Sequence, residues 1–393
     1  MGAYELLDAR SCEIETLMPD TPKPSRSAKQ GLPAAADTKS STKPRPGGKV
    51  ASGRPDTPKP ATPANDAKRR VSKSPHMDAE KLQLDQAAVI RQVAPEKQRF
   101  GFVAIIGATN AGKSTLVNRL VGTKVTIVSH KVQTTRMPIR GIAIEDASQL
   151  VFVDTPGIFK PRRRLDRAMV KAAWGGAGEA DIVVLLFDAQ RGVDDETRQL
   201  VSRLADVGAP ACLALNKIDA INKDRLLNLA QELNAHGKFQ QTFMISALKG
   251  AGVDDLKRYL ANAVPQGLWH YPADDVTDAP MRILASEITR EKIYARLHEE
   301  LPYATTVETT SWKEMGKRGV RIEQTIFVER DSQKSIVLGE GGRAIKRIST
   351  ESRAELTEIV GRPVHLFLFV KVREGWEHDP ERYREMGLEF PTE

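Results

Sequence analysis

The sequence predicts two globular domains: a doubly wound α/β domain with a mostly parallel sheet, followed by a smaller α+β domain. Three observations support this prediction. Between residues 100 and 265, short apolar runs alternate with helix-length segments, the pattern of a parallel sheet covered by helices on both faces. A stretch with three prolines and no helical period follows at 265–280, which is typical of a linker. Beyond it the order of the predicted helices and strands changes.

Five buried strands are expected in the first domain, because five apolar runs lack the polar alternation of a strand with one face in water. Helix-length segments separate them, and the helix at 223–237 is expected to end at Gly237. A domain of this kind binds its ligands at the carboxyl ends of the strands. The five runs are FVAIIG (102–107), LVFVD (150–154), IVVLLFD (182–188), CLALNK (212–217) and TFMIS (242–246).

The second domain is expected to begin with an amphipathic helix at 281–300. Two alternating strands, a glycine-rich loop leading into a helix at 339–360, and a last strand would follow. About 110 residues are enough for such a domain to have a core of its own. The three strands are TTVETTSW (305–312), VRIEQTIFVER (320–330) and VHLFLFVKV (364–372).

The N-terminal segment is expected to form a disordered tail over residues 1–97. Ten of the 23 prolines lie between residues 21 and 76, among Ser, Ala, Thr and Lys, and Tyr4 is the only aromatic residue before Phe100. This composition cannot bury enough apolar surface to offset the entropy of ordering. Met77 opens the first stretch without proline clusters and is an alternative translation start.

The positive charge of the chain belongs to this tail. Residues 21–76 carry 13 Lys or Arg against three Asp, whereas the whole chain has a net charge of +8. The remainder is therefore slightly acidic, and overall basicity does not show whether the folded part binds nucleic acid. The tail either touches RNA or a membrane surface through non-specific electrostatics, or is a solvated linker.

Cysteine usage and hydropathy favour a cytoplasmic protein. Cys12 and Cys212 are the only cysteines, so neither a disulfide framework nor a thiolate metal site is expected. No apolar run approaches the roughly 20 residues needed to span a bilayer, and residues 1–20 are acidic, unlike an organellar transit peptide. A peripheral contact with the inner face of the cell membrane stays open.

A phosphate-binding loop is predicted at GATNAGKS, residues 107–114. It fits the pattern G-x-x-x-x-G-K-[ST] and stands between a predicted strand and a helix, as a P-loop requires. Lys113 would reach the β- and γ-phosphates and the Ser114 hydroxyl would ligate Mg²⁺. A tight turn without a nucleotide is the alternative. The residues expected to contact the phosphates are Gly107, Asn110, Ala111, Gly112, Lys113, Ser114 and Thr115.

Another strand end carries residues that fit the γ-phosphate side of a nucleotide. In VDTPG (153–157), Asp154 is placed to hold Mg²⁺ through a water, and the Gly157 N–H can face the γ-phosphate. An Asp at a strand end is often only a cap or turn residue. Its position after the phosphate loop favours the metal role.

Two later segments point to guanine rather than adenine. In LNKID (215–219), Asp219 can accept from both donors on the Watson–Crick edge of guanine, and Asn216 can donate to its other edge. The stem of Lys217 can cover the base. Adenine presents the opposite donor and acceptor pattern, so this motif selects GTP. In SALKG (246–250) the Ala247 N–H would face the guanine oxygen, with Ser246 and Leu248 beside it.

In this order, GATNAGKS, DTPG, NKID and SAL, with SHKVQTTRMPIRGI (129–142) between the first two, resemble the Era family of bacterial GTPases. The resemblance implies binding of GTP and GDP with Mg²⁺, and GTP hydrolysis. It places the QTTR segment at the first switch, with Thr135 as a ligand of Mg²⁺ and the γ-phosphate and Thr134 as its rival.

Hydrolysis is expected to be slow. Ile158 stands where Ras-like enzymes carry the glutamine that orients water, and no arginine finger is identifiable. The expected catalytic residues are therefore Lys113, Thr135 and Asn110. Era relatives with an Asn in the phosphate loop use K⁺ in place of an arginine charge, and the resemblance extends this to Asn110. Stabilisation of the turn is the alternative role of that side chain.

The second glycine-rich loop, GEGG at 339–342, lacks a Lys-Ser pair and is not a second nucleotide site. It fits the G-x-x-G loop of KH domains, which clamps about four single-stranded nucleotides, although by itself the pattern describes many loops. The expected helix, strand, strand, helix, helix, strand order around it resembles the Era KH domain, of type II. Era loops commonly have a basic residue where this chain has Gly341. The expected RNA contacts are Gly339, Gly342, Arg343 and Lys346.

The resemblance covers about residues 100–390. It implies an Era-type GTPase domain at 98–268, a linker at 269–279 and the KH domain at 280–390. The implied function is GTP-dependent binding of the 3′ end of 16S rRNA in 30S subunit assembly, by a monomer. One alternative is an RNA-binding scaffold whose nucleotide is structural and hardly hydrolysed. Another, a tRNA-modification GTPase, would need a catalytic cysteine or a cofactor domain.

Overall fold

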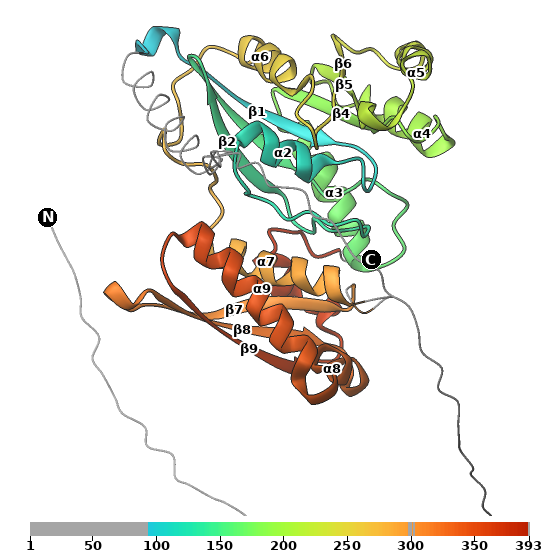
Figure 1. Cartoon of the computed structure of the whole chain (residues 1–393). Coiled ribbons are helices and arrows are strands. Elements are labelled where there is room, and N and C mark those ends of the chain that lie inside the picture. Colours follow the sequence, from blue (N-terminus) through green and yellow to red (C-terminus); the bar gives the residue numbers. More distant parts are fainter. Residues whose placement is uncertain (1–92, 298–300, 302, 392–393) are drawn as a thin grey trace, which may run out of the picture. The chain divides into compact units, whose positions relative to one another are not determined.

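The computed structural model describes residues 93–297, 301 and 303–391 (Figure 1). The tail predicted at 1–97, with Met77 and Cys12, lies outside the described residues up to residue 92. Pro95–Lys97 already form a 3-10 turn, so regular structure begins slightly before the predicted boundary. In the described part, none of the helices has both the length and the apolar character that crossing a bilayer requires.

The first domain contains a six-stranded sheet with the order β2-β3-β1-β4-β5-β6 (Figure 1). The five predicted strands are confirmed, and neighbours among them are parallel. β2 runs antiparallel to β3 and was not predicted, because its first half lies in the segment assigned to the switch region. The strands are β1 (Arg99–Ile106), β2 (Ile139–Glu145), β3 (Ser148–Asp154), β4 (Ile182–Asp188), β5 (Ala211–Asn216) and β6 (Thr242–Met244).

Helices cover both faces of this sheet, which explains why its strands are apolar throughout. Buried side chains of α2 and α6 fill one core, and those of α3, α4 and α5 fill the other. The N–H of Gly237 bonds to Leu233 and ends α5, as predicted. The helices are α2 (Lys113–Val121), α3 (Arg164–Gly178), α4 (Asp195–Leu204), α5 (Lys223–His236) and α6 (Val253–Ala263).

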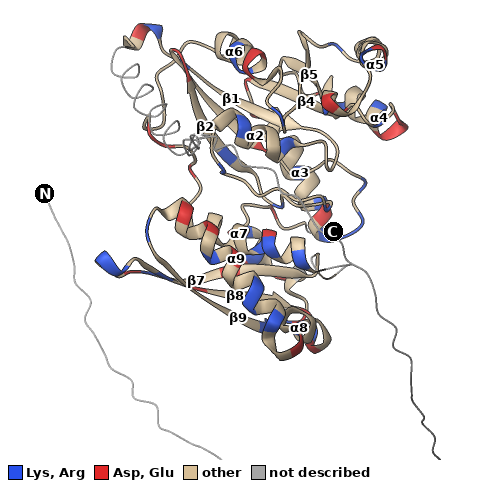
Figure 2. Ribbon diagram, viewed as in Figure 1, with Lys and Arg blue, Asp and Glu red and all other residues tan. Residues whose placement is uncertain are grey.

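The second domain has the predicted order of helices and strands. Its sheet has the order β7-β8-β9, with β7 antiparallel and β9 parallel to β8. α7 and α9 contribute to its cores, and Figure 2 shows basic residues in the first turns of α9. The elements are α7 (Met281–Arg296), β7 (Thr305–Glu314), β8 (Val320–Val328), α8 (Asp331–Leu338), α9 (Arg343–Val360) and β9 (Val364–Val372).

The segment predicted as a linker contains no helix or strand but is hydrogen-bonded to the first domain's sheet. Gln149 Oε1 accepts from the N–H groups of His270 and Tyr271. The Thr277 hydroxyl donates to the Arg140 carbonyl at 2.7 Å. The segment is therefore anchored along β2 and β3, and α7 begins shortly after the last of these contacts.

A final helix, α10 (Pro380–Glu385), follows the second domain and was not predicted. Its residue Tyr383, together with Trp376, is buried against Leu165 and Met169 of α3. The segment from Trp376 to Phe390 thus packs on the first domain.

Candidate functional site

A cavity of about 510 Å³ opens at the carboxyl ends of the strands in the first domain. The phosphate loop, the switch segment and the loops after β5 and β6 line it. Most predicted nucleotide contacts lie on its wall, and only three lie behind it. The lining residues among the predictions are Asn110, Gly112, Lys113, Ser114, Thr115, Thr135, Gly157, Asn216, Lys217, Asp219, Ser246, Ala247 and Leu248, and those behind are Gly107, Ala111 and Asp154.

The phosphate loop needs glycine at two positions. Gly107 has φ +153° and a Cβ there would lie 2.3 Å from the Leu186 carbonyl oxygen. Gly112 has φ +99° and a Cβ there would lie 2.4 Å from Asn216 Nδ2. Because no side chain fits at either point, the loop keeps its backbone N–H groups accessible to a phosphate.

Lys113 is 6% exposed and points back into the loop. Its Nζ donates to the carbonyl oxygens of Gly107 at 3.1 Å and Ala108 at 2.9 Å. Burial lowers the pKa of Lys113 to about 8, although the charge of Asp154 opposes this shift. The ammonium group is thus held in a site that favours an added negative charge.

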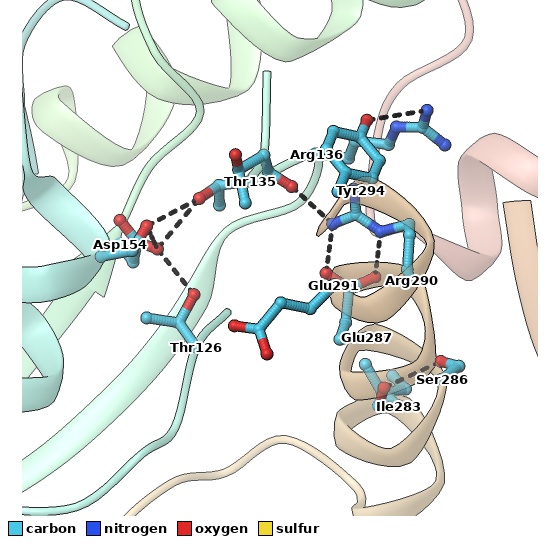
Figure 3. A network of polar contacts seen from close by, with 12 residues as sticks. Thr126, Thr135, Arg136, Asp154, Ile283, Ser286, Glu287, Arg290, Glu291 and Tyr294 are labelled. Carbon is cyan, nitrogen blue, oxygen red and sulfur yellow. Dashed lines mark hydrogen bonds and ion pairs between the residues drawn. The ribbon is translucent and has the colours of Figure 1, made fainter. Parts of the chain in front are cut away.

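Three hydroxyl groups converge on the carboxylate of Asp154, and Figure 3 shows those of Thr126 and Thr135. Oδ2 accepts from Ser114 Oγ at 2.8 Å, from Thr126 Oγ1 at 2.8 Å and from Thr135 Oγ1 at 3.2 Å. Burial raises the pKa of Asp154, although Lys113 and these hydrogen bonds act in the opposite direction. A buried carboxylate of this kind gains from a nearby cation.

The arrangement fits Mg²⁺, which prefers oxygen ligands and keeps waters and substrate phosphates among them. Oδ1 of Asp154 is buried without a hydrogen-bond partner among the described residues, so it can accept from a water on the metal. In the same part of the chain, no group of three or more His, Cys, Asp or Glu side chains can hold a metal. One carboxylate with two hydroxyls therefore suits an ion that also binds a nucleotide.

The two threonines of the switch segment point in different directions. Thr135 Oγ1 lies 2.9 Å from Ser114 Oγ, next to the candidate Mg²⁺ site. Thr134 Oγ1 donates to the Lys131 carbonyl within its own loop at 2.8 Å. This geometry favours Thr135 over its rival as the ligand. Thr126 was missed, because nothing in its sequence neighbourhood distinguishes it from an ordinary buried threonine.

Asn110 lines the cavity, whereas Ile158 does not. Asn110 has φ +60°, and its Nδ2 donates to the His130 carbonyl at 2.9 Å, so it also links the phosphate loop to the switch segment. Ile158 packs against the apolar core of the first domain, and its N–H donates to the Gly107 carbonyl at 3.0 Å. Gly157 lies against Thr109, which a Cβ would approach to 2.7 Å.

At the other end of the cavity, Asn216 is engaged within the protein. Its Nδ2 donates to the Ala111 carbonyl at 2.8 Å, and its Oδ1 accepts from the Ala247 N–H at 2.9 Å. Asn216 therefore connects the phosphate loop to the loop after β6. The sequence had assigned the Asn216 side chain and the Ala247 N–H to the base, whereas in this structure these two groups bond to each other.

Asp219 lines the cavity, and its carboxylate is fixed by neighbouring side chains. Its Oδ1 accepts from Ser246 Oγ at 2.7 Å, and its Oδ2 lies 3.3 Å from Lys249 Nζ. The hydrogen bond from Ser246 lowers the pKa of Asp219, so the side chain is an ionised acceptor. Lys217 forms an ion pair with Asp188 at 2.6 Å, which fixes the lysine stem beside the cavity.

The second glycine-rich loop connects α8 to α9. Gly339 has φ +70°, and a Cβ there would lie 2.7 Å from the Ala344 Cβ. Gly341 and Gly342 also have positive φ, but space around them is open. Arg343 forms an ion pair with Glu340, and both side chains are mostly exposed. Lys346 is exposed.

Comparisons with known proteins agree with this geometry. A family model described as 50S ribosome-binding GTPase matches residues 102–217, and a KH domain model matches residues 300–377. GTPase Era of Sinorhizobium medicae is 62% identical over 293 residues, which cover 75% of this chain and 94% of that protein. GTPase Era of Afipia carboxidovorans is 62% identical over 303 residues, which cover 76% and 98%.

Solved structures of Era are also similar to this chain. A crystal structure of Era in complex with MgGDPNP and nucleotides 1506–1542 of 16S ribosomal RNA has a TM-score of 0.70 and 37% sequence identity. The match covers 74% of this chain and 99% of that one. A variant of Aquifex aeolicus Era bound to GDP·AlF4⁻ has the same TM-score, identity and coverage.

Proposed function

Because the chain belongs to the Era family of GTPases, we propose that it binds GTP with Mg²⁺ and uses the nucleotide to control binding of 16S rRNA in 30S subunit assembly. As a member of that family it is a GTPase. The observation that carries the proposal is the convergence of Ser114, Thr135 and Asp154 at one end of the cavity. Asp219 at the other end supplies the acceptor for guanine.

The nucleotide roles follow the length of the cavity. The phosphate loop from Gly107 to Thr115 surrounds the phosphates with N–H groups, and Lys113 adds a positive charge. Ser114 and Thr135 are the direct ligands of Mg²⁺, while Asp154 holds a water on it. Gly157 donates its N–H to the γ-phosphate. A bound Mg²⁺ neutralises charge that develops on the phosphate oxygens during hydrolysis.

The base is held by the loops after β5 and β6. Asp219 accepts from the two donors of guanine, and the stem of Lys217 covers the ring. Asn216 acts mainly by fixing the phosphate loop against the Ala247 loop. Ser246 orients Asp219, and the backbone at Leu248 completes the wall.

Hydrolysis by this site depends on how the phosphate loop, Mg²⁺ and Lys113 position the nucleotide, because Ile158 cannot orient a water. We propose that Asn110 helps to bind a K⁺ ion. This ion would supply the charge that an arginine finger supplies in other GTPases. The exposed position of Asn110 within the phosphate loop suits that role. Equal GTPase rates in K⁺ and Na⁺ would remove Asn110 from the mechanism and leave it as a link to His130.

RNA binding belongs to the KH domain. The relative crystallised with nucleotides 1506–1542 of 16S ribosomal RNA supports 16S rRNA as the ligand, and we take its 3′ end to be the part that binds. Gly339 and Gly342 let the RNA backbone approach closely, and Arg343 and Lys346 on α9 contact its phosphates. GTP favours the RNA-bound state and hydrolysis favours release.

The domain bounds that fit this function are 98–268 for the GTPase domain, 269–279 for the linker and 280–390 for the KH domain. We propose a cytoplasmic monomer that works on the 30S subunit. A peripheral contact with the cell membrane through the basic tail at 21–76 is part of this proposal. Fractionation of cells with and without residues 1–76 tests the contact.

Multiple-turnover phosphate release tests the central proposal. Purified protein is incubated with excess GTP, with and without an RNA that contains nucleotides 1506–1542 of 16S rRNA. We expect many phosphates per protein molecule and a higher rate with RNA. At most one phosphate per protein, with RNA binding intact, would favour the scaffold whose nucleotide is structural.

A further inference from the structure

Two arginines, Arg136 and Arg290, join the residues on either side of Thr135 to the KH domain. Both are drawn in Figure 3. Arg290 in α7 of the KH domain donates an Nη2 hydrogen bond to the Thr134 carbonyl. Arg136 points the other way and donates to the carbonyl oxygens of Thr305 at 2.7 Å and Tyr303 at 2.9 Å. The residues before and after Thr135 are thus both bonded to the KH domain.

Both arginines are buried, Arg290 at 2% and Arg136 at 5% exposure. A buried charge carries a large desolvation penalty unless it is paired and hydrogen-bonded. Arg290 is paired with Glu287 on its own helix, with Nε donating to Oε1 at 2.8 Å. Its Nη1 has no hydrogen-bond partner among the described residues, so one donor is available for a rearranged switch segment.

The same helix also contacts the residue just before the switch segment (129–142). Glu291 Oε1 accepts from the Val128 N–H at 2.9 Å, and Glu291 Oε2 accepts from Lys124 Nζ at 2.7 Å. Neighbouring residues of α7 therefore contact the chain at Val128, just before the switch segment, and at Thr134 within it. The segment between these points contains Ser129 and His130, which line the nucleotide cavity.

Thr135 connects these contacts to the nucleotide. Its Oγ1 bonds to Ser114 Oγ and to Asp154 Oδ2, while its backbone neighbours bond to the KH domain. Consecutive Cα atoms are about 3.8 Å apart and joined by a planar peptide. A shift of the Thr134 carbonyl therefore moves Thr135 relative to the Mg²⁺ site.

We propose that Arg290 is a positioning residue of the nucleotide site, supplied by the KH domain, that holds Thr135 toward Mg²⁺ and the γ-phosphate. This inference rests on the proposed function. GTP, which engages Thr135, strengthens the contact between α7 and the switch segment, whereas GDP does not. Linkage requires the reverse as well: a KH domain held in this contact raises the affinity for GTP by the same factor.

The test replaces the buried pair without leaving an unpaired charge. The double variant Arg290→Met/Glu287→Met removes both charges together. In Arg290→Lys the charge stays, but the simultaneous hydrogen bonds of the guanidinium to Glu287 and to the Thr134 carbonyl are lost. The matched control is Arg296→Met, because Arg296 lies on the same helix and pairs with Glu351 within the KH domain. Affinities for GDP and for a non-hydrolysable GTP analogue are measured with Mg²⁺.

In the double variant we expect the ratio of GTP-analogue to GDP affinity to fall about tenfold, with GDP affinity unchanged. In the Arg290→Lys variant the affinity ratio should fall by a smaller factor, and in the Arg296→Met control it should not change. Hydrogen exchange in the nucleotide-free protein should rise at residues 129–138 in both Arg290 variants. This second readout does not depend on bound nucleotide.

A folded Arg290→Lys or double variant with an unchanged affinity ratio would overturn the inference, as would unchanged exchange at 129–138. Thermal unfolding shows whether each variant is folded, and if the double variant is not, Arg290→Lys decides. Failure of the proposed function gives a different result: the wild-type protein itself would then bind GDP and the GTP analogue equally, or neither.

Discussion

Ser114 Oγ and Thr135 Oγ1 lie 2.9 Å apart although 21 residues separate them in the sequence. The carboxylate of Asp154 joins them: β1 and β3 pair in parallel and place Ile105 beside Asp154, near the start of the helix that carries Ser114. Both hydroxyls bond to the same carboxylate oxygen. A bound Mg²⁺ therefore meets an arrangement of oxygen atoms that the fold has already assembled.

Thr135→Val should weaken binding of a GTP analogue about tenfold and leave GDP binding nearly unchanged, because the lost hydroxyl serves only the triphosphate state. Thr134→Val is the matched control, since its hydroxyl bonds to the Lys131 carbonyl. Fluorescence titration with both nucleotides measures the difference. A larger effect at Thr134 would show that the rival residue is the ligand.

Asp219→Asn should change the preferred base from guanine to xanthine. The carboxylate accepts from two donors of guanine, whereas an amide can donate to the oxygen that xanthine carries in place of the amino group. We expect GTP affinity to fall about 100-fold, with a gain for XTP. Competition binding measures both, and Asp224→Asn, on the exposed side of α5, is the control. Equal losses for both nucleotides would contradict the assigned role.

Lys113 should make stability depend on pH in alkaline solution. Burial lowers its folded-state pKa to about 8, so between about pH 8 and the unfolded value near 10.4 the unfolded chain binds more protons. The contribution of this group to stability therefore rises with pH across that window, by up to ~3 kcal/mol.

Urea unfolding of the nucleotide-free protein and of Lys113→Met checks this prediction. Between pH 8 and pH 10 the free energy of unfolding should shift in favour of the wild type relative to the variant. A constant difference would mean that Lys113 titrates at its ordinary pKa. Lys171→Met, at an exposed position on α3, controls for the general effect of removing a lysine.

Gly341→Lys should strengthen RNA binding a few-fold, because it adds one phosphate contact at a loop position with open space. The slope of log affinity against log salt should steepen by about 0.7 for single-stranded RNA. Gly361→Lys is matched: it adds the same charge at the far end of α9, with a similar φ of +69° and open space. An equal gain in both variants would indicate general attraction rather than a contact at the loop.

Sequence patterns predicted most of the fold because the first domain's strands are continuous apolar runs buried on both faces, while a strand such as β9 alternates between more and less buried positions. IVVLLFD and VHLFLFVKV became β4 and β9 with the predicted bounds. β2 escaped prediction because IRGIAIE mixes polar and apolar residues and follows an irregular segment. α10 escaped because six residues carry too little periodicity, and its position depends on contact with α3.

The nucleotide motifs were readable because each is a short run of residues at one strand end, where backbone geometry and chemistry are local. Contacts between distant residues were not readable. No local pattern announces that Thr126 bonds to Asp154, that Asn216 joins Ala111 to Ala247, or that Glu340 pairs with Arg343.

By itself, the sequence determined a guanine-nucleotide domain, since its motifs are short runs at strand ends, whereas the KH domain followed from the resemblance of the second half to the Era family. Only the tertiary structure decided that Arg290 of the KH domain reaches the carbonyl next to Thr135. The two residues are far apart in the chain, and no periodicity relates them. Their contact exists because two separately folded domains bury a shared set of charges, which is a property of packing rather than of local sequence.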